Sequence, residues 1–187
     1  MIAAREGAQQ RTGLMNVPAL SFTAVPGLPE VKAGDDLARL LLDAFRASGE
    51  PVVHMQHVWD EPDAPFMRPG TDGVEIHPSV APAEGETIVQ KAHPNSFLDT
   101  GLEEFLRGRG VDSVVVCGMM TAMCVDATVR AASDLGFAAS VAHDACATRD
   151  LSFGGREVPA ADVHAAFLAA LDGSYARVAS AEELAGE

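Results

Sequence analysis

The chain has 187 residues, of which 48% are hydrophobic and 21% charged, as expected for a folded globular protein. Its formal net charge of −14 argues against a nucleic-acid partner, because a phosphate backbone requires a basic surface. No apolar run is long enough to span a bilayer, and the first ten residues lack the apolar core of a signal peptide. We therefore expect a cytoplasmic protein with neither a membrane nor a nucleic-acid partner.

Segments typical of strands and helices alternate from residue 34 onward. The first helix is expected after Asp35 or Asp36, either of which can cap it, and it should end at Gly49. The other expected elements are strands at 51–57, 87–90, 112–118, 137–143 and 176–180, and helices at 99–107, after Cys124, and at 160–171. This alternation predicts a three-layer α/β domain that includes residues 1–187, in which helices cover both faces of a parallel sheet.

Two parts of the chain fit this pattern less well. The N-terminal segment is apolar around residues 14–25, but Pro18 interrupts it and argues against a central strand. The segment 58–86 is rich in Pro, Gly and Asp and shows no periodicity. Connections of that length usually carry function, for example as a lid over a site.

Three polar side chains follow successive strands, namely Lys91, Cys124 and Asp144. The carboxyl ends of parallel strands form the ligand crevice of such sheets, so we expect these residues near one another. Cys124 also precedes a helix, where unpaired N–H groups and the helix dipole lower the pKa of a thiol and can bind an oxyanion. Asp144 has the alternative role of a helix or turn cap. Cys117 and Cys146 lie in apolar runs and are expected to be inert.

The chain resembles the isochorismatase-like cysteine hydrolases of the nicotinamidase/isochorismatase superfamily over about residues 34–180. The resemblance is strongest in KAHPNSF (91–97) and VVVCGMMTAMCVDATVRAASDLGF (114–137), and HDACATRD (143–150) extends it. It implies a three-layer α/β/α Rossmann-like fold with a central, mostly parallel sheet of about six strands, of which the first is atypical here. It also implies a homo-oligomer that acts on a small-molecule substrate.

The resemblance further implies a catalytic triad of Asp, Lys and Cys. Cys124 corresponds to the nucleophile and Lys91 to the lysine. A cis peptide bond is expected between Met119 and Met120, so that the N–H groups of Met120 and Cys124 form an oxyanion hole, while Thr121 holds the turn. Attack by Cys124 gives a thioester that water hydrolyses. Because isochorismatases proper lack this cysteine, its presence favours an amide or another C–N bond as the target.

The aspartate of the triad has no match in this sequence. The family places it at the end of the first strand in an Asp-x-Gln motif, whereas this chain has Ala8-Gln9-Gln10. Glu6 substitutes for it, or a carboxylate comes from elsewhere, or the proton carrier is missing. Two alternative functions follow: a catalytically impaired member that binds a metabolite, and a non-amide hydrolase of the isochorismatase type, which Cys124 disfavours.

The segment after residue 51 offers candidates for the substrate pocket and for a metal. His57 is expected to line the pocket, with apolar walls supplied by Trp59, Phe66 and Phe97. Nicotinamidases bind zinc in this region, but His54 and His57 are three residues apart on a strand and point to opposite faces. The least unfavourable ligand set is His57, His77 and an aspartate, and we expect no metal or other cofactor. His93 and Asn95 are expected to position the loop after Lys91, and His164 to be structural.

Overall fold

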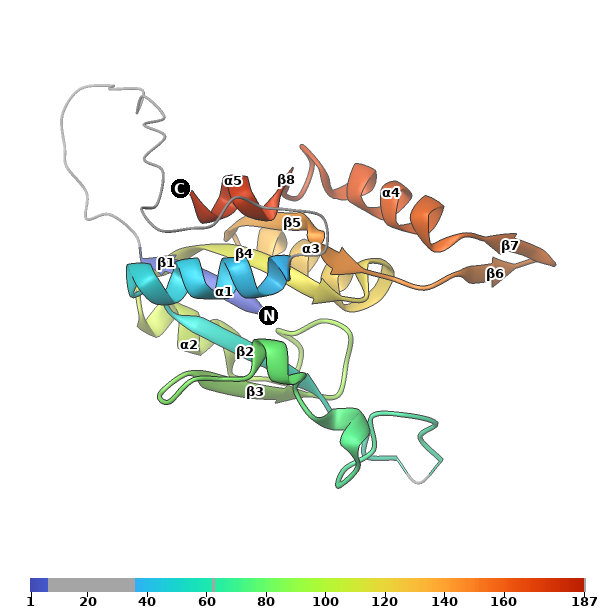
Figure 1. Cartoon of the computed structure of the whole chain (residues 1–187), viewed down its shortest axis with the longest axis horizontal. Helices are drawn as coiled ribbons and strands as arrows, with labels where there is room; N and C mark the ends of the chain where they lie inside the picture. The colour runs from blue at the N-terminus through green and yellow to red at the C-terminus, as the bar shows by residue number, and fades with distance from the viewer. Residues whose placement is uncertain (7–35, 62, 187) are drawn as a thin grey trace.

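The computed structural model describes residues 1–6, 36–61 and 63–186, so Ala8 and Pro18 lie outside the described residues. Its main feature is a six-stranded sheet with the strand order β3-β2-β1-β4-β5-β8 (Figure 1). The strands of this sheet are β1 (Ile2–Glu6), β2 (Val52–His57), β3 (Thr87–Lys91), β4 (Val111–Met119), β5 (Ala138–Ala147) and β8 (Arg177–Ala179). The helices are α1 (Leu37–Ser48), α2 (Leu102–Gly108), α3 (Asp126–Asp134), α4 (Ala160–Leu171) and α5 (Ala181–Ala185).

Strand β1 runs antiparallel to both of its neighbours, β2 and β4, whereas the other pairs in the sheet are parallel. The expectation of a mostly parallel sheet with an atypical first strand is therefore confirmed. This direction places the start of β1 beside the carboxyl end of β4, where Met1 and Cys117 exchange backbone hydrogen bonds. Glu6, at the other end of β1, pairs with Val111 at the start of β4.

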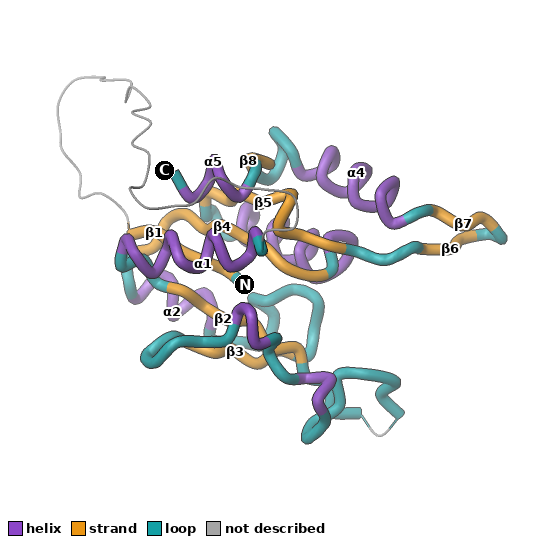
Figure 2. Tube along the Cα trace, viewed as in Figure 1, coloured by secondary structure: helices purple, strands orange, loops and turns teal. Residues whose placement is uncertain are grey.

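Helices cover both faces of the sheet and give the expected three layers (Figure 2). Helices α1 and α5 pack on one face through Leu41, Phe45 and Leu184. Helices α2, α3 and α4 pack on the other face through buried aliphatic side chains that include Leu106 and Val129. Burial of this apolar surface is the main stabilising contribution to the domain.

Local signals fix the ends of α1 as the sequence predicts. The Asp36 side chain accepts a hydrogen bond from the Arg39 N–H and thereby caps the helix. Gly49 ends it with a left-handed φ of 74°, which glycine adopts without steric cost. Helix α4 also has the expected bounds, whereas α2 begins at Leu102 rather than at residue 99.

Some elements do not follow from the sequence pattern. A hairpin of β6 (Leu151–Phe153) and β7 (Arg156–Val158) projects away from the sheet (Figure 1). Helix α5 is too short for periodicity to reveal it, although Ser180 and Glu183 form a capping box at its start. The loop between β2 and β3 contains two short 3-10 helices, Asp72–Val74 and Pro78–Val80. Among the described residues, no helix combines the length and apolarity needed to cross a bilayer.

Candidate active site

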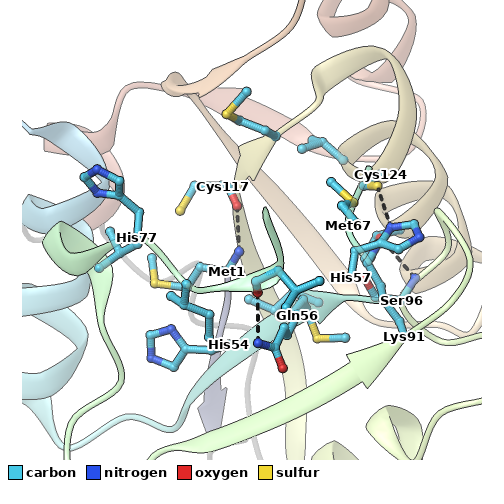
Figure 3. A pocket seen from close by; sticks show the side chains of 18 of the residues that line it. Met1, His54, Gln56, His57, Met67, His77, Lys91, Ser96, Cys117 and Cys124 are labelled. Atoms are coloured by element: carbon cyan, nitrogen blue, oxygen red, sulfur yellow. Dashed lines mark hydrogen bonds between the residues drawn. The ribbon is translucent and has the colours of Figure 1, made fainter. Parts of the chain in front are cut away.

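A cavity of about 260 Å³ lies at the carboxyl edge of the sheet, where β2, β3 and β4 end. Lys91 and Cys124 both line it, as the strand-end argument predicts. Its polar lining also includes Gln56, His57 and Ser96 (Figure 3). The loop between β2 and β3 covers one side with residues from Gly73 to Val80, so this long connection does contribute to the pocket.

Cys124 lies in a single helical turn, Thr121–Val125, that joins β4 to α3. The peptide bond between Met119 and Met120 is cis. The carbonyl oxygen of Met120 accepts hydrogen bonds from the N–H groups of Met123 and Val125, which lie on either side of Cys124 in the chain. The Cys124 side chain is half-buried and faces the cavity.

Thr121 anchors this turn from its buried side. Its side chain is fully buried, and its hydroxyl lies 2.9 Å from Nδ1 of His164 on α4. The contact ties the turn to a helix more than 40 residues later in the sequence. Thr121, which was expected to hold the turn, and His164, which was expected to be structural, thus link the turn to α4.

Lys91 ends β3 and is nearly buried, with 6% of its surface exposed. Its ammonium donates a 2.6 Å hydrogen bond to the carbonyl oxygen of Pro94. Burial lowers the pKa of Lys91, while interaction with Cys124 opposes this effect. Lys91 thus brings its amino group into the cavity that Cys124 also lines.

The loop after Lys91 is held in part by Thr128, a residue that sequence reasoning did not connect with this loop. The hydroxyl of Thr128, on α3, accepts a hydrogen bond from the Ser96 N–H and lies 2.9 Å from the Ser96 hydroxyl. It also lies 3.3 Å from the Pro94 carbonyl oxygen that Lys91 contacts. Asn95 organises the same loop by accepting from the Phe97 N–H, as expected. No sequence motif marks Thr128, since its partners lie more than 30 residues away.

His57 ends β2 beside Lys91, with which it pairs in the sheet register. Its Nδ1 lies 3.8 Å from Sγ of Cys124, within the range of a hydrogen bond that involves sulfur (Figure 3). Burial lowers the pKa of His57, and the positive charge of Lys91 lowers it further. His57 thus lines the pocket as predicted, but its contact with the cysteine was not anticipated.

The three aromatic residues predicted to wall the pocket are not among the residues that line this cavity. Trp59 and Phe66 pack edge to face against each other, with ring centroids 5.3 Å apart, and Phe66 is half exposed. Phe97 stacks on Phe137 in the hydrophobic core. The walls are formed instead by aliphatic side chains such as Val74.

Two carboxylates proposed from sequence lie elsewhere. Glu6 pairs with Val111 at the start of β4. The full length of β4 separates the backbone of Glu6 from the turn of Cys124. The prediction that Glu6 supplies the acid is therefore not supported. Asp144 accepts a hydrogen bond from the Ala181 N–H at the start of α5, which is its alternative role as a cap. Among the pocket-lining residues that the structure describes, Glu75 is the only carboxylate, and it is exposed.

The histidines form no metal site with the carboxylates or cysteines that the structure describes. In the described part of the chain, no three or more His, Cys, Asp and Glu side chains are grouped so as to hold a metal ion. His54 is buried and lies 2.8 Å from Glu86, which is partly buried. His77 lies across the pocket from His57 (Figure 3) and caps a 3-10 helix.

Comparison with known proteins agrees with this geometry. The family model of the Isochorismatase domain matches residues 22–183. The chain is 50% identical over 151 residues to the uncharacterized isochorismatase family protein YddQ of Bacillus subtilis, covering 81% of this chain and 83% of YddQ. It is 36% identical over 138 residues to streptothricin hydrolase of Streptomyces noursei, covering 74% of this chain but only 49% of that enzyme. A crystal structure from Oleispira antarctica, assigned as an isochorismatase hydrolase, superposes with a TM-score of 0.78 at 53% identity, covering 81% and 80% of the two chains. The chain therefore belongs to the isochorismatase family of hydrolases.

Proposed function

We propose that this protein is a cysteine hydrolase that cleaves a small-molecule amide or another C–N bond through a thioester on Cys124. One observation carries the proposal: a nearly buried lysine, Lys91, and a helix-turn cysteine line the same cavity at the carboxyl edge of the sheet. The similarity to streptothricin hydrolase and to maleamate amidohydrolase of Pseudomonas putida, both hydrolases by their names, supports hydrolysis as the reaction class.

The proposed reaction begins when the Cys124 thiolate attacks the carbonyl carbon of the substrate. Lys91 stabilises the thiolate as an ammonium ion, and burial strengthens this interaction because few water molecules screen it. We assign the oxyanion hole to the N–H groups of Met120 and Cys124. The carbonyl oxygen of Met120 accepts hydrogen bonds from the N–H groups of Met123 and Val125 and not from the N–H of Cys124, which lies between them in the chain. We propose that this N–H binds the oxyanion.

A second function, metabolite binding without turnover, is favoured by one specific observation. Among the described residues that line the pocket, no buried carboxylate accompanies Lys91 and Cys124. The family's reaction uses such a group to move the proton to the leaving amine. A protein without any proton carrier would retain the pocket and lose catalysis.

Incubation with an activated ester and with a panel of small amides distinguishes these functions. For a hydrolase, intact-mass spectrometry should detect an acyl adduct on Cys124, and product should accumulate. Cys124→Ala should abolish both signals, whereas Cys117→Ala keeps the reactive thiol and should retain them. Hydrolysis that persists in Cys124→Ala contradicts the thioester mechanism. Saturable ligand binding with neither an adduct nor product supports the binding function.

A further inference from the structure

We propose that the imidazole of His57 is the catalytic proton carrier of this chain, in the role that the family gives to an aspartate. The inference rests on the proposed hydrolase function and assigns one more catalytic residue to the same site. It follows from two observations. His57 contacts the sulfur of Cys124, and the only carboxylate among the described pocket-lining residues, Glu75, is exposed.

The geometry brings His57 to the reacting sulfur. Nδ1 of His57 lies 3.8 Å from Sγ of Cys124. Catalytic hydrogen bonds are often long in a free enzyme and shorten when substrate binds. The backbone of His57 is also held in the sheet, where it pairs with Lys91.

The charges around His57 favour the neutral ring that a base requires. The ionisable groups that act on it are Lys91 on β3, His93 in the following loop, and Cys124 in the turn after β4. Burial lowers the pKa of His57, and the charges of Lys91 and His93 act in the same direction, while the backbone of Ala92 opposes them in part. Lys91 as an ammonium cannot accept a proton, whereas the neutral ring of His57, whose Nδ1 is 3.8 Å from the Cys124 sulfur, can.

The atoms balance in two half-reactions. In the first, His57 takes the Cys124 thiol proton, a C–S bond forms, the C–N bond breaks, and the imidazolium returns its proton to the leaving nitrogen. In the second, His57 takes a proton from water as the oxygen attacks the thioester. The C–S bond then breaks, and the proton returns to the cysteine sulfur. The sum is an amide and water converted into a carboxylic acid and an amine.

The first experiment needs no substrate, because iodoacetamide alkylates the Cys124 thiolate directly. Alkylation rates between about pH 5 and 9 are measured by intact mass for wild type, His57→Gln and His143→Gln. His143 is exposed and does not line the pocket, so its variant is the matched control. His57→Gln should react about ten-fold more slowly at pH 7, with its profile moved to higher pH by about one unit. An identical profile in wild type and His57→Gln overturns the proposal.

The second experiment separates proton delivery from thiol activation. p-Nitrophenyl acetate has a leaving group that needs no proton, whereas the nitrogen of an amide does. His57→Gln should lose about 100-fold or more in amide hydrolysis and far less in acetylation of Cys124 by the ester. Equal losses for both substrates indicate a structural role and overturn the proposal. Failure of wild type to form the acetyl adduct, with an alkylation profile that still depends on His57, refutes the hydrolase function instead.

A measurement on Cys124→Ala covers the case in which His57→Gln does not fold. The His57 imidazole is titrated by NMR in wild type and in Cys124→Ala, both of which retain the ring. Coupling between the two groups predicts a shift of the imidazole titration by about half a pH unit or more when the thiol is removed. Identical titrations contradict a functional pair.

Discussion

The Lys91 ammonium and the Pro94 carbonyl oxygen are joined by a 2.6 Å hydrogen bond inside the loop that follows β3. The hydroxyl of Thr128 lies 3.3 Å from the same carbonyl oxygen and accepts from the Ser96 N–H. Thr128 belongs to α3, the helix that follows the turn of Cys124. The position of Lys91 is therefore coupled to the helix that follows the turn of Cys124.

Thr128→Val tests this coupling with almost no change in side-chain shape. The buried Ser96 N–H loses its acceptor, so the free energy of unfolding should fall by about 1–3 kcal/mol. Urea unfolding gives this value, and alkylation of Cys124 should slow in the same variant because Lys91 is less well held. Thr71→Val, at an exposed loop position, should stay within about 0.5 kcal/mol of wild type. Equal stability of the two variants contradicts the structural role of Thr128.

The three cysteines should differ sharply in reactivity. Burial raises the pKa of Cys117, and burial raises the pKa of Cys146 to about 12. Only about one in 10⁵ molecules then carries a Cys146 thiolate at pH 7. Iodoacetamide should therefore label the native protein once, at Cys124, and peptide mapping checks the position. Cys124→Ala should remove the label and Cys146→Ala should keep it; a label on Cys117 or Cys146 at neutral pH contradicts this assignment.

The sequence predicted those parts of the molecule that local signals determine. The cap at Asp36, the terminator Gly49 and the bounds of α4 all depend on residues within a few positions of one another. Lys91 and Cys124 were also placed correctly, since parallel strands bring their carboxyl ends to one edge. These predictions required no knowledge of long-range packing.

The remaining features depend on long-range contacts that the spacing of residues in the sequence does not predict. The direction of β1 follows from its pairing with β2 and β4, more than 40 and 100 residues away. The contact between His57 and Cys124 spans 67 positions, and an alternating strand pattern says only which face His57 occupies. Phe97 was expected in the pocket but stacks on Phe137, because an aromatic side chain serves a core or a pocket equally well.

Replacement of Lys91 by methionine should reduce the reactivity of Cys124 and leave the sheet intact. Methionine keeps an unbranched side chain of similar length but removes the positive charge that favours the thiolate. Alkylation at pH 7 should fall by about ten-fold or more, and product formation should fall with it. Arg39→Met removes an exposed positive charge that does not line the cavity and is the control. If both variants react at the wild-type rate, Lys91 does not activate the thiol.

Glu86 should make the stability of the protein depend on pH below about 4.5. Its carboxylate accepts hydrogen bonds of 2.6 and 2.8 Å from Arg46 and one of 2.8 Å from the Ala83 N–H, and it lies 2.8 Å from His54. The Arg46 hydrogen bonds, with those from Ala83 and His54, lower the pKa of Glu86 from 4.5 to about 2. Because the folded state binds this proton less readily than the unfolded state, the stabilisation is complete above pH 4.5 and is lost as the pH falls towards 2.

At pH 7, Glu86→Gln should lower the free energy of unfolding by about 2–3 kcal/mol, and this difference from wild type should shrink in acid. Urea unfolding at several pH values measures it, with the exposed Glu84→Gln as control. A difference that stays constant with pH would show that Glu86 acts through packing and not through its charge.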